Sequence, residues 1–177
     1  HQKGYQQAYR SMEAAAKDTE GEMLFYQSKV CEGVFHRISS GTTRDGLEVF
    51  GKMEKGYLLS VDSNWDMYGD GYLSGHYFSE EALREQLEKA YPGLVFTEEP
   101  LEKQINMYKQ DKVGHILSLT VGNKMISGEE FRQLLELPSS NFTMQAADGK
   151  IRFLCKGQGH GLGLSQYGGN VLAKEGK

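Results

Sequence analysis

A glycine-rich run near the end of the chain constrains the fold more than any other feature. Glycine occupies every second position from Gly157 to Gly163, with His160 at the centre. Glycine is used where φ must be positive or where the backbone must approach another group closely. The run connects a predicted strand to a helix predicted to open near Ser165, so its N–H groups should favour anions and carbonyl oxygens. A tight structural loop with an inert, hydrogen-bonded His160 remains the alternative.

The glycine-rich run does not match the common glycine motifs of enzymes. No Gly-Lys-Ser/Thr follows it, so it is not a phosphate-binding P-loop, and no βαβ unit with a downstream acid surrounds it. In Gly163-Leu164-Ser165-Gln166-Tyr167, tyrosine stands where a nucleophile elbow has its second glycine. The sequence therefore excludes nucleotide binding and serine hydrolysis at this run.

Hydrophobic periodicity predicts an α+β fold: one mixed domain over residues 1–177 with an antiparallel-rich sheet and a few short helices. Asp148-Gly149 is a strong two-residue turn signal and predicts a hairpin. The helices are expected near residues 5–17, 79–90, 128–137 and 166–175, and the strands near 23–26, 29–38, 57–61, 113–121 and 142–155.

Composition excludes several classes of partner. The formal net charge is −4 without long charged blocks, so no nucleic acid is expected as a partner. No two of the 5 histidines share the spacing of metal ligands, so neither a metal nor another cofactor is expected. Cys31 and Cys155 are either two free buried thiols or a disulfide, and the sequence leaves both open.

A second polar segment follows a predicted strand. His36 is succeeded by hydroxyl and arginine side chains that include Ser40 and Thr42, which suits a hydrogen-bond-rich ligand such as a sugar, although an ordinary solvated loop has the same composition. If strands 29–38 and 151–156 share one sheet, His36 and His160 should lie close together in a groove open to solvent.

These segments resemble the stage II sporulation protein D (SpoIID/LytB) family. Its signature reads roughly G-H-G-[hydrophobic]-G-[ML]-S-Q-Y-G, and Gly159 to Gly168 is similar to it. Four further segments match the family in the order in which they occur there: Asp18-Thr19-Glu20-Gly21, Phe35 to Arg44, Gly56 to Asp62, and Ser127 to Leu135.

The resemblance implies cleavage of peptidoglycan glycan strands by lytic transglycosylation, in sporulation or cell-wall remodelling. It implies an extracytoplasmic location at the wall, other cell-wall hydrolases as partners, and a membrane anchor outside this stretch. The alternative is a non-catalytic wall-binding module that enhances an amidase. The residues expected to bind the substrate are His36, Ser40, Thr42, Gly159, His160, Ser165, Gln166 and Tyr167.

The chain departs from the family at the catalytic acid. The family carries a glutamate in a glutamate-methionine-proline segment near the start of the domain, and this sequence has none. Glu22 precedes Met23, but Leu24 replaces the proline, so Glu22 is interpreted as a surface strand residue. The stretch is therefore expected to lack the N-terminal catalytic segment and the extreme C-terminus of the domain. The catalytic residue and the enzymatic status of this chain remain undecided.

Overall fold

The computed structural model describes residues 2–177, which form two compact units, residues 2–33 and 34–177. The first unit contains the predicted amphipathic helix, α1 (Gln2–Asp18), followed by a hairpin of β1 (Phe25–Tyr26) and β2 (Lys29–Val30). Gln27 and Ser28 both have positive φ, as a two-residue hairpin turn requires. Glu22 is exposed, but it precedes β1, so its assignment to a strand is wrong.

The second unit contains the remaining elements, and both of its three-stranded sheets are antiparallel, which confirms the α+β prediction. One sheet has the order β4-β9-β8 and the other β5-β6-β7. The strands are β3 (Phe35–His36), β4 (Leu73–Ser79), β5 (Ile105–Gln110), β6 (Ile116–Val121), β7 (Lys124–Ser127), β8 (Phe142–Ala147), β9 (Lys150–Lys156) and β10 (Leu164–Ser165). The helices are α2 (Gly46–Phe50), α3 (Glu80–Ala90), α4 (Gly128–Leu134) and α5 (Gln166–Lys174), with 3-10 turns η1 (Met53–Lys55), η2 (Asn64–Tyr68) and η3 (Leu101–Lys103).

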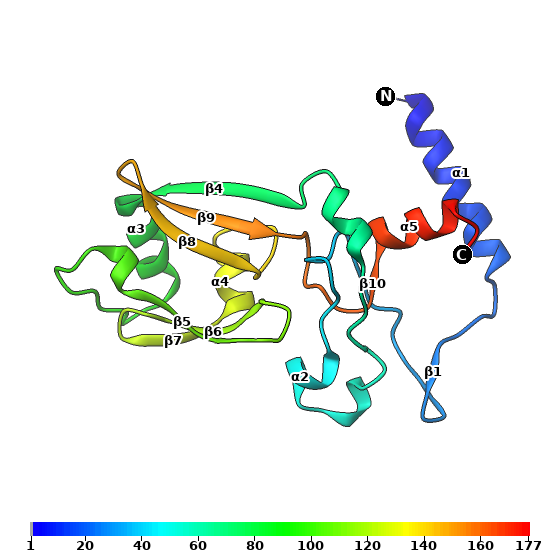
Figure 1. Cartoon of the computed structure of the whole chain (residues 1–177), viewed down its shortest axis with the longest axis horizontal. Helices are drawn as coiled ribbons and strands as arrows, with labels where there is room; N and C mark the ends of the chain where they lie inside the picture. Colours follow the sequence, from blue (N-terminus) through cyan, green and yellow to red (C-terminus); the bar gives the residue numbers. More distant parts are fainter. Residues whose placement is uncertain (1) are drawn as a thin grey trace. The chain divides into compact units, whose positions relative to one another are not determined.

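The hydrophobic core lies between the two sheets, where Figure 1 shows α4. Phe131 of α4 packs against Phe142 of β8 and Phe153 of β9, with ring centroids 5.6 Å away in each case. Leu119 and Val121 of β6 are fully buried from the other side. This packed core supports β9, whose last residue leads directly into the glycine-rich run.

The four predicted helices are present, and their caps explain where they begin. Ser79 caps α3 and Ser165 caps α5, each through a side-chain oxygen that accepts a backbone N–H. The predicted strand at residues 57–61 is wrong: this segment is irregular and bonds to the Thr43 backbone and hydroxyl instead of to a ladder. The predicted strand at residues 29–38 is also wrong, because only β2 and β3 form within it, in different sheets. Strands β4, β5, β7 and β10 were not predicted.

The capping box of α4 gives a first testable prediction. Ser127 accepts from the Glu130 N–H at 3.1 Å, and the Glu130 carboxylate accepts from the Ser127 N–H and hydroxyl, which hold the pKa of Glu130 below its ordinary value. Ser127→Ala should lower the free energy of unfolding by about 1 kcal/mol, measured by urea denaturation. The control Glu88→Ala, on the exposed side of α3, should change it by less than about 0.5 kcal/mol.

Candidate functional site

The glycine-rich run and the residues that follow it pair through backbone hydrogen bonds with the segment that carries His36. Strand β3 pairs in parallel with β10, so that Ser165 is opposite His36. Beyond β3, Ile38 and Gln158 exchange backbone hydrogen bonds of 3.1 and 2.7 Å. The expectation that the two segments face each other is confirmed, but the reason differs from the one predicted. Residues 151–156 form β9 of another sheet, and the loops themselves make the contact.

The glycines permit this close approach. Gly157, Gly159, Gly161 and Gly163 all have positive φ. A Cβ on Gly163 would lie 2.0 Å from the carbonyl oxygen of Val34, and a Cβ on Gly161 would lie 2.9 Å from Nε2 of His115. Any larger residue at these two positions would push the segments apart.

His36 and His160 lie side by side, with ring centroids 5.9 Å apart. Each ring bonds to Leu162: Nδ1 of His36 contacts the Leu162 carbonyl at 2.9 Å, and Nδ1 of His160 accepts the Leu162 N–H at 3.1 Å. Burial lowers the pKa of His36 and also that of His160. His36 is only 4% exposed, so it does not line an open groove as expected. Both imidazoles hold the glycine-rich run in place.

Two buried carboxylates, which the sequence did not single out, secure the same region. Asp66 of η2 is fully buried and accepts from the Ser39 N–H at 2.7 Å and from the Ser165 hydroxyl at 2.8 Å. Asp111 lies 2.6 Å from Nε of Arg44, and Arg44 also donates to the His160 carbonyl at 3.0 Å. No spacing in the sequence connects these residues, because they lie far apart along the chain.

His115 is a third imidazole in this cluster, and the sequence placed it only within the predicted strand at residues 113–121. It precedes β6, is 2% exposed, and contacts the Ser140 hydroxyl through Nδ1 at 3.0 Å. Burial, followed by the charges of Arg44 and the other two imidazoles, lowers the pKa of His115 to about 3. Within residues 2–177, no cluster of three or more His, Cys, Asp or Glu side chains is arranged to hold a metal ion.

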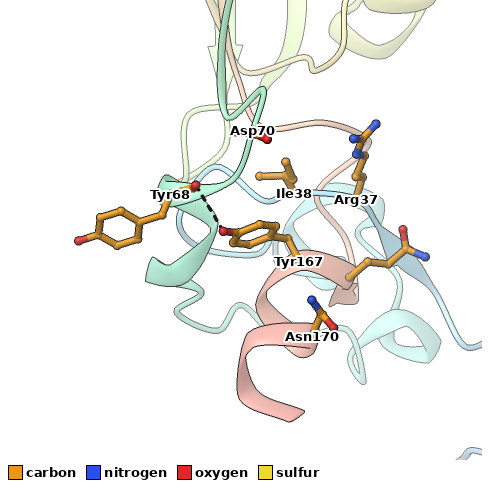
Figure 2. A pocket seen from close by; sticks show the side chains of 7 residues that line it. Arg37, Ile38, Tyr68, Asp70, Tyr167 and Asn170 are labelled. Carbon is orange, nitrogen blue, oxygen red and sulfur yellow. Dashed lines mark hydrogen bonds between the residues drawn. The ribbon is translucent and has the colours of Figure 1, made fainter. Parts of the chain in front are cut away.

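A surface pocket lies where the segment after β3 meets the first turn of α5. It has a volume of about 470 Å³. Figure 2 shows the ring of Tyr167 near Ile38, with its hydroxyl donating to the Tyr68 carbonyl at 3.3 Å. The lining residues are Arg37, Ile38, Tyr68, Asp70, Gln166, Tyr167 and Asn170.

The predicted site residues therefore divide into two groups. Gln166 and Tyr167 line the pocket, where a ligand can reach them. The others support the loops. Ser165 caps α5, Thr42 donates to Asp62 at 3.3 Å, Gly159 packs on His36, and the Ser40 hydroxyl is buried. Their assignment as substrate contacts stays a prediction. Tyr68, Asp70 and Asn170 were missed because they belong to no motif.

The comparison with known proteins covers almost the whole chain. It is 31% identical to stage II sporulation protein D of Bacillus amyloliquefaciens over 182 residues, which cover 98% of this chain and 48% of that protein. The identity to stage II sporulation protein D of Bacillus subtilis (strain 168) is 28% over 174 residues, with the same coverage of 98% and 48%. The chain belongs to the SpoIID family.

This SpoIID stretch spans about half the length of the curated relatives it matches. It is also 28% identical, over 168 residues, to an uncharacterised protein of Brachyspira hyodysenteriae, which covers 93% of this chain and 44% of that protein. No family model matches the chain. No helix within residues 2–177 is long and apolar enough to cross a membrane. Cys31 and Cys155 are both free thiols, and burial raises the pKa of Cys155 to about 11.

Proposed function

We propose that this chain is part of a sporulation-related cell-wall protein and that its surface pocket binds peptidoglycan glycan strands. One observation carries the proposal: two adjacent residues of the family signature, Gln166 and Tyr167, lie in the pocket lining, whereas the rest of the signature is used to position them. The signature is thus organised around a surface that a ligand can reach.

The lining has the chemistry that a sugar chain requires. Glycan strands present hydroxyl groups and acetamido groups, which both donate and accept hydrogen bonds. The amides of Gln166 and Asn170 do the same, and both side chains are exposed. Tyr167 adds an aromatic ring with an apolar face and a polar tip. The volume of about 470 Å³ lies within the range of about 300–1,000 Å³ that is typical of ligand pockets.

The proposed reaction of the whole protein is lytic transglycosylation. An acid protonates the oxygen between muramic acid and glucosamine, and a hydroxyl of the sugar closes an anhydro product. Such an acid needs a carboxyl group whose pKa is raised by a shielded environment. Asp70 is the only carboxylate in the lining, and it is exposed. We therefore assign this chain the binding of the strand and place the acid elsewhere in the whole protein.

The exposed position of Asp70 also favours the second candidate, a wall-binding module without catalysis that acts beside a partner hydrolase. Both candidates place the protein outside the cytoplasm, at the wall. They differ in the products. Incubation of the whole protein with purified wall yields anhydro-sugar ends if it is a transglycosylase, and intact strands if it only binds.

Replacement of the pocket tyrosine tests binding in either case. Tyr167→Ala removes the ring and its bond to the Tyr68 carbonyl, so the dissociation constant for purified glycan strands should rise about tenfold, as for a typical contact residue. The measurement is co-sedimentation with purified sacculi at increasing protein concentration. Tyr108→Ala is the matched control, because Tyr108 is 69% exposed on β5 and does not line the pocket. Equal losses for the two variants would contradict the assignment of the pocket.

A further inference from the structure

The pocket presents two opposite charges that are not paired with each other. Arg37 and Asp70 are both exposed in its lining. Neither side chain forms a hydrogen bond or an ion pair within the part of the chain that the structure describes, residues 2–177. The buried Arg44 and Asp111 instead contact each other at 2.6 Å. The guanidinium and the carboxylate of the pocket therefore keep their full bonding capacity for a ligand.

The backbone beneath these two side chains is anchored. The Arg37 carbonyl accepts the Tyr167 N–H at 3.1 Å. The Asp70 carbonyl accepts from the side-chain amide of Gln158 at 3.3 Å, and the backbone of Gln158 is bonded to Ile38. The backbone at both charged residues is therefore fixed by hydrogen bonds to the glycine-rich run and to α5. Because this backbone is already ordered, ligand binding costs less conformational entropy.

We infer that this pocket recognises a unit that carries a free carboxylate beside hydrogen-bond donors, with Arg37 binding the carboxylate and Asp70 accepting from a hydroxyl or amide N–H. The inference rests on the proposed function, in which the ligand is wall glycan. Two groups of that polymer have this chemistry: the lactyl carboxylate of a muramic acid without a peptide, and the carboxylates of a stem peptide.

The geometry of the two side chains explains the choice. A guanidinium is planar and presents parallel N–H donors that match both oxygens of a carboxylate, and this charge-assisted pair is about twice as strong as a neutral one. An ionised carboxylate only accepts hydrogen bonds, so Asp70 selects donors. A sugar chain with acetamido groups alone satisfies Asp70 and the two amides, but it leaves the Arg37 charge without a partner.

Calorimetric titration with matched ligands tests the inference. The first ligand is a soluble glycan strand without peptides, and the second is the same strand with its carboxylates converted to primary amides. The third is a β-1,4-linked N-acetylglucosamine oligomer of equal length, and the fourth is a strand that keeps its peptides. The unmodified chain should bind the acid form about tenfold more tightly than the amide form. Tight binding of the fourth ligand alone would identify the stem peptide as the source of the carboxylate.

Variants assign the effect to the two residues. Arg37→Ala should bind the acid and amide forms with equal affinity, because the group that distinguishes them is gone. Asp70→Asn should weaken both forms by the same factor. Lys150→Ala, an exposed cation at the β8–β9 turn, should behave as the unmodified chain does.

The outcomes separate this inference from the proposed function. Binding of all glycans without any effect of amidation, or an equal loss of both forms in Arg37→Ala, would overturn the inference and leave glycan binding intact. Failure of the unmodified chain to bind any of the four ligands would overturn both.

Discussion

Arg44→Met should cost this chain about 3–5 kcal/mol of folding free energy, because it leaves the Asp111 carboxylate buried without its cation. The side chains of Arg44 and Asp111 are 5% and 1% exposed, and the contact between them is 2.6 Å. Arg44 also donates to the His160 carbonyl, so its loss frees the centre of the glycine-rich run. Since domains are stable by only about 5–15 kcal/mol, this loss is a large fraction of the total free energy of unfolding. The free energy of unfolding of the variant is measured by urea denaturation followed by circular dichroism.

A double variant is the control for the buried charge. In Arg44→Met with Asp111→Asn, the carboxylate is replaced by a neutral amide that still accepts the backbone N–H groups of Val113 and His115. It should recover a large part of the loss, because the penalty comes mainly from the unpaired charge. A double variant less stable than Arg44→Met alone would show that the penalty comes from lost packing.

Stability should fall steeply as the pH drops below 6.5. The folded-state pKa of His115 is about 3 and its ordinary value is 6.5, so between these values the unfolded chain binds a proton that the folded chain excludes. The contribution of neutral His115 to the free energy of unfolding is therefore fully present above pH 6.5, and it is lost as the pH falls toward 3. Each pH unit in this window costs about 1.4 kcal/mol, so His115 alone should remove about 2 kcal/mol by pH 5. His36 and His160 act in the same direction, because burial lowers the pKa of each.

His115→Asn tests this origin of the acid sensitivity. An amide can keep the contact to the Ser140 hydroxyl, but it does not titrate in this range. The variant should be less stable at pH 7 and should lose less stability between pH 7 and pH 5 than the unmodified chain. If the free energy of unfolding of His115→Asn falls with pH as steeply as that of the unmodified chain, another group causes the acid sensitivity.

Local patterns in the sequence predicted most of the elements that the structure contains. Asp148-Gly149 forms the turn between β8 and β9 as predicted, and three of the predicted helices begin within one residue of their expected starts, where Ser79, Ser127 and Ser165 cap them. These signals act between residues that are near in sequence. The hydrogen bond that a cap accepts, or the positive φ that a turn needs, is determined by two to four consecutive residues.

The errors concern elements whose stability depends on distant residues. β4 has an alternating burial pattern, but its glycine and aromatic residues hide the period, and it is a strand because β9 pairs with it over its full length. Residues 57–61 have the composition of a strand, but no strand lies beside them to complete a ladder. His115 resembles an ordinary residue at the start of a strand because Arg44, His36 and His160 reach it only in the folded chain.

The sequence by itself determined the fold class, the caps, the hairpin turn and the family, because each depends on short motifs or on residue identity along the chain. Only the tertiary structure decided which polar residues line the surface pocket. Gln166 and Tyr167 lie in the pocket, whereas Ser165 beside them is buried against Asp66, and this difference arises from the direction in which α5 leaves its cap. Arg37, Asp70 and Asn170 join the pocket from separate segments because the alternating glycines let those segments approach within backbone hydrogen-bond distance.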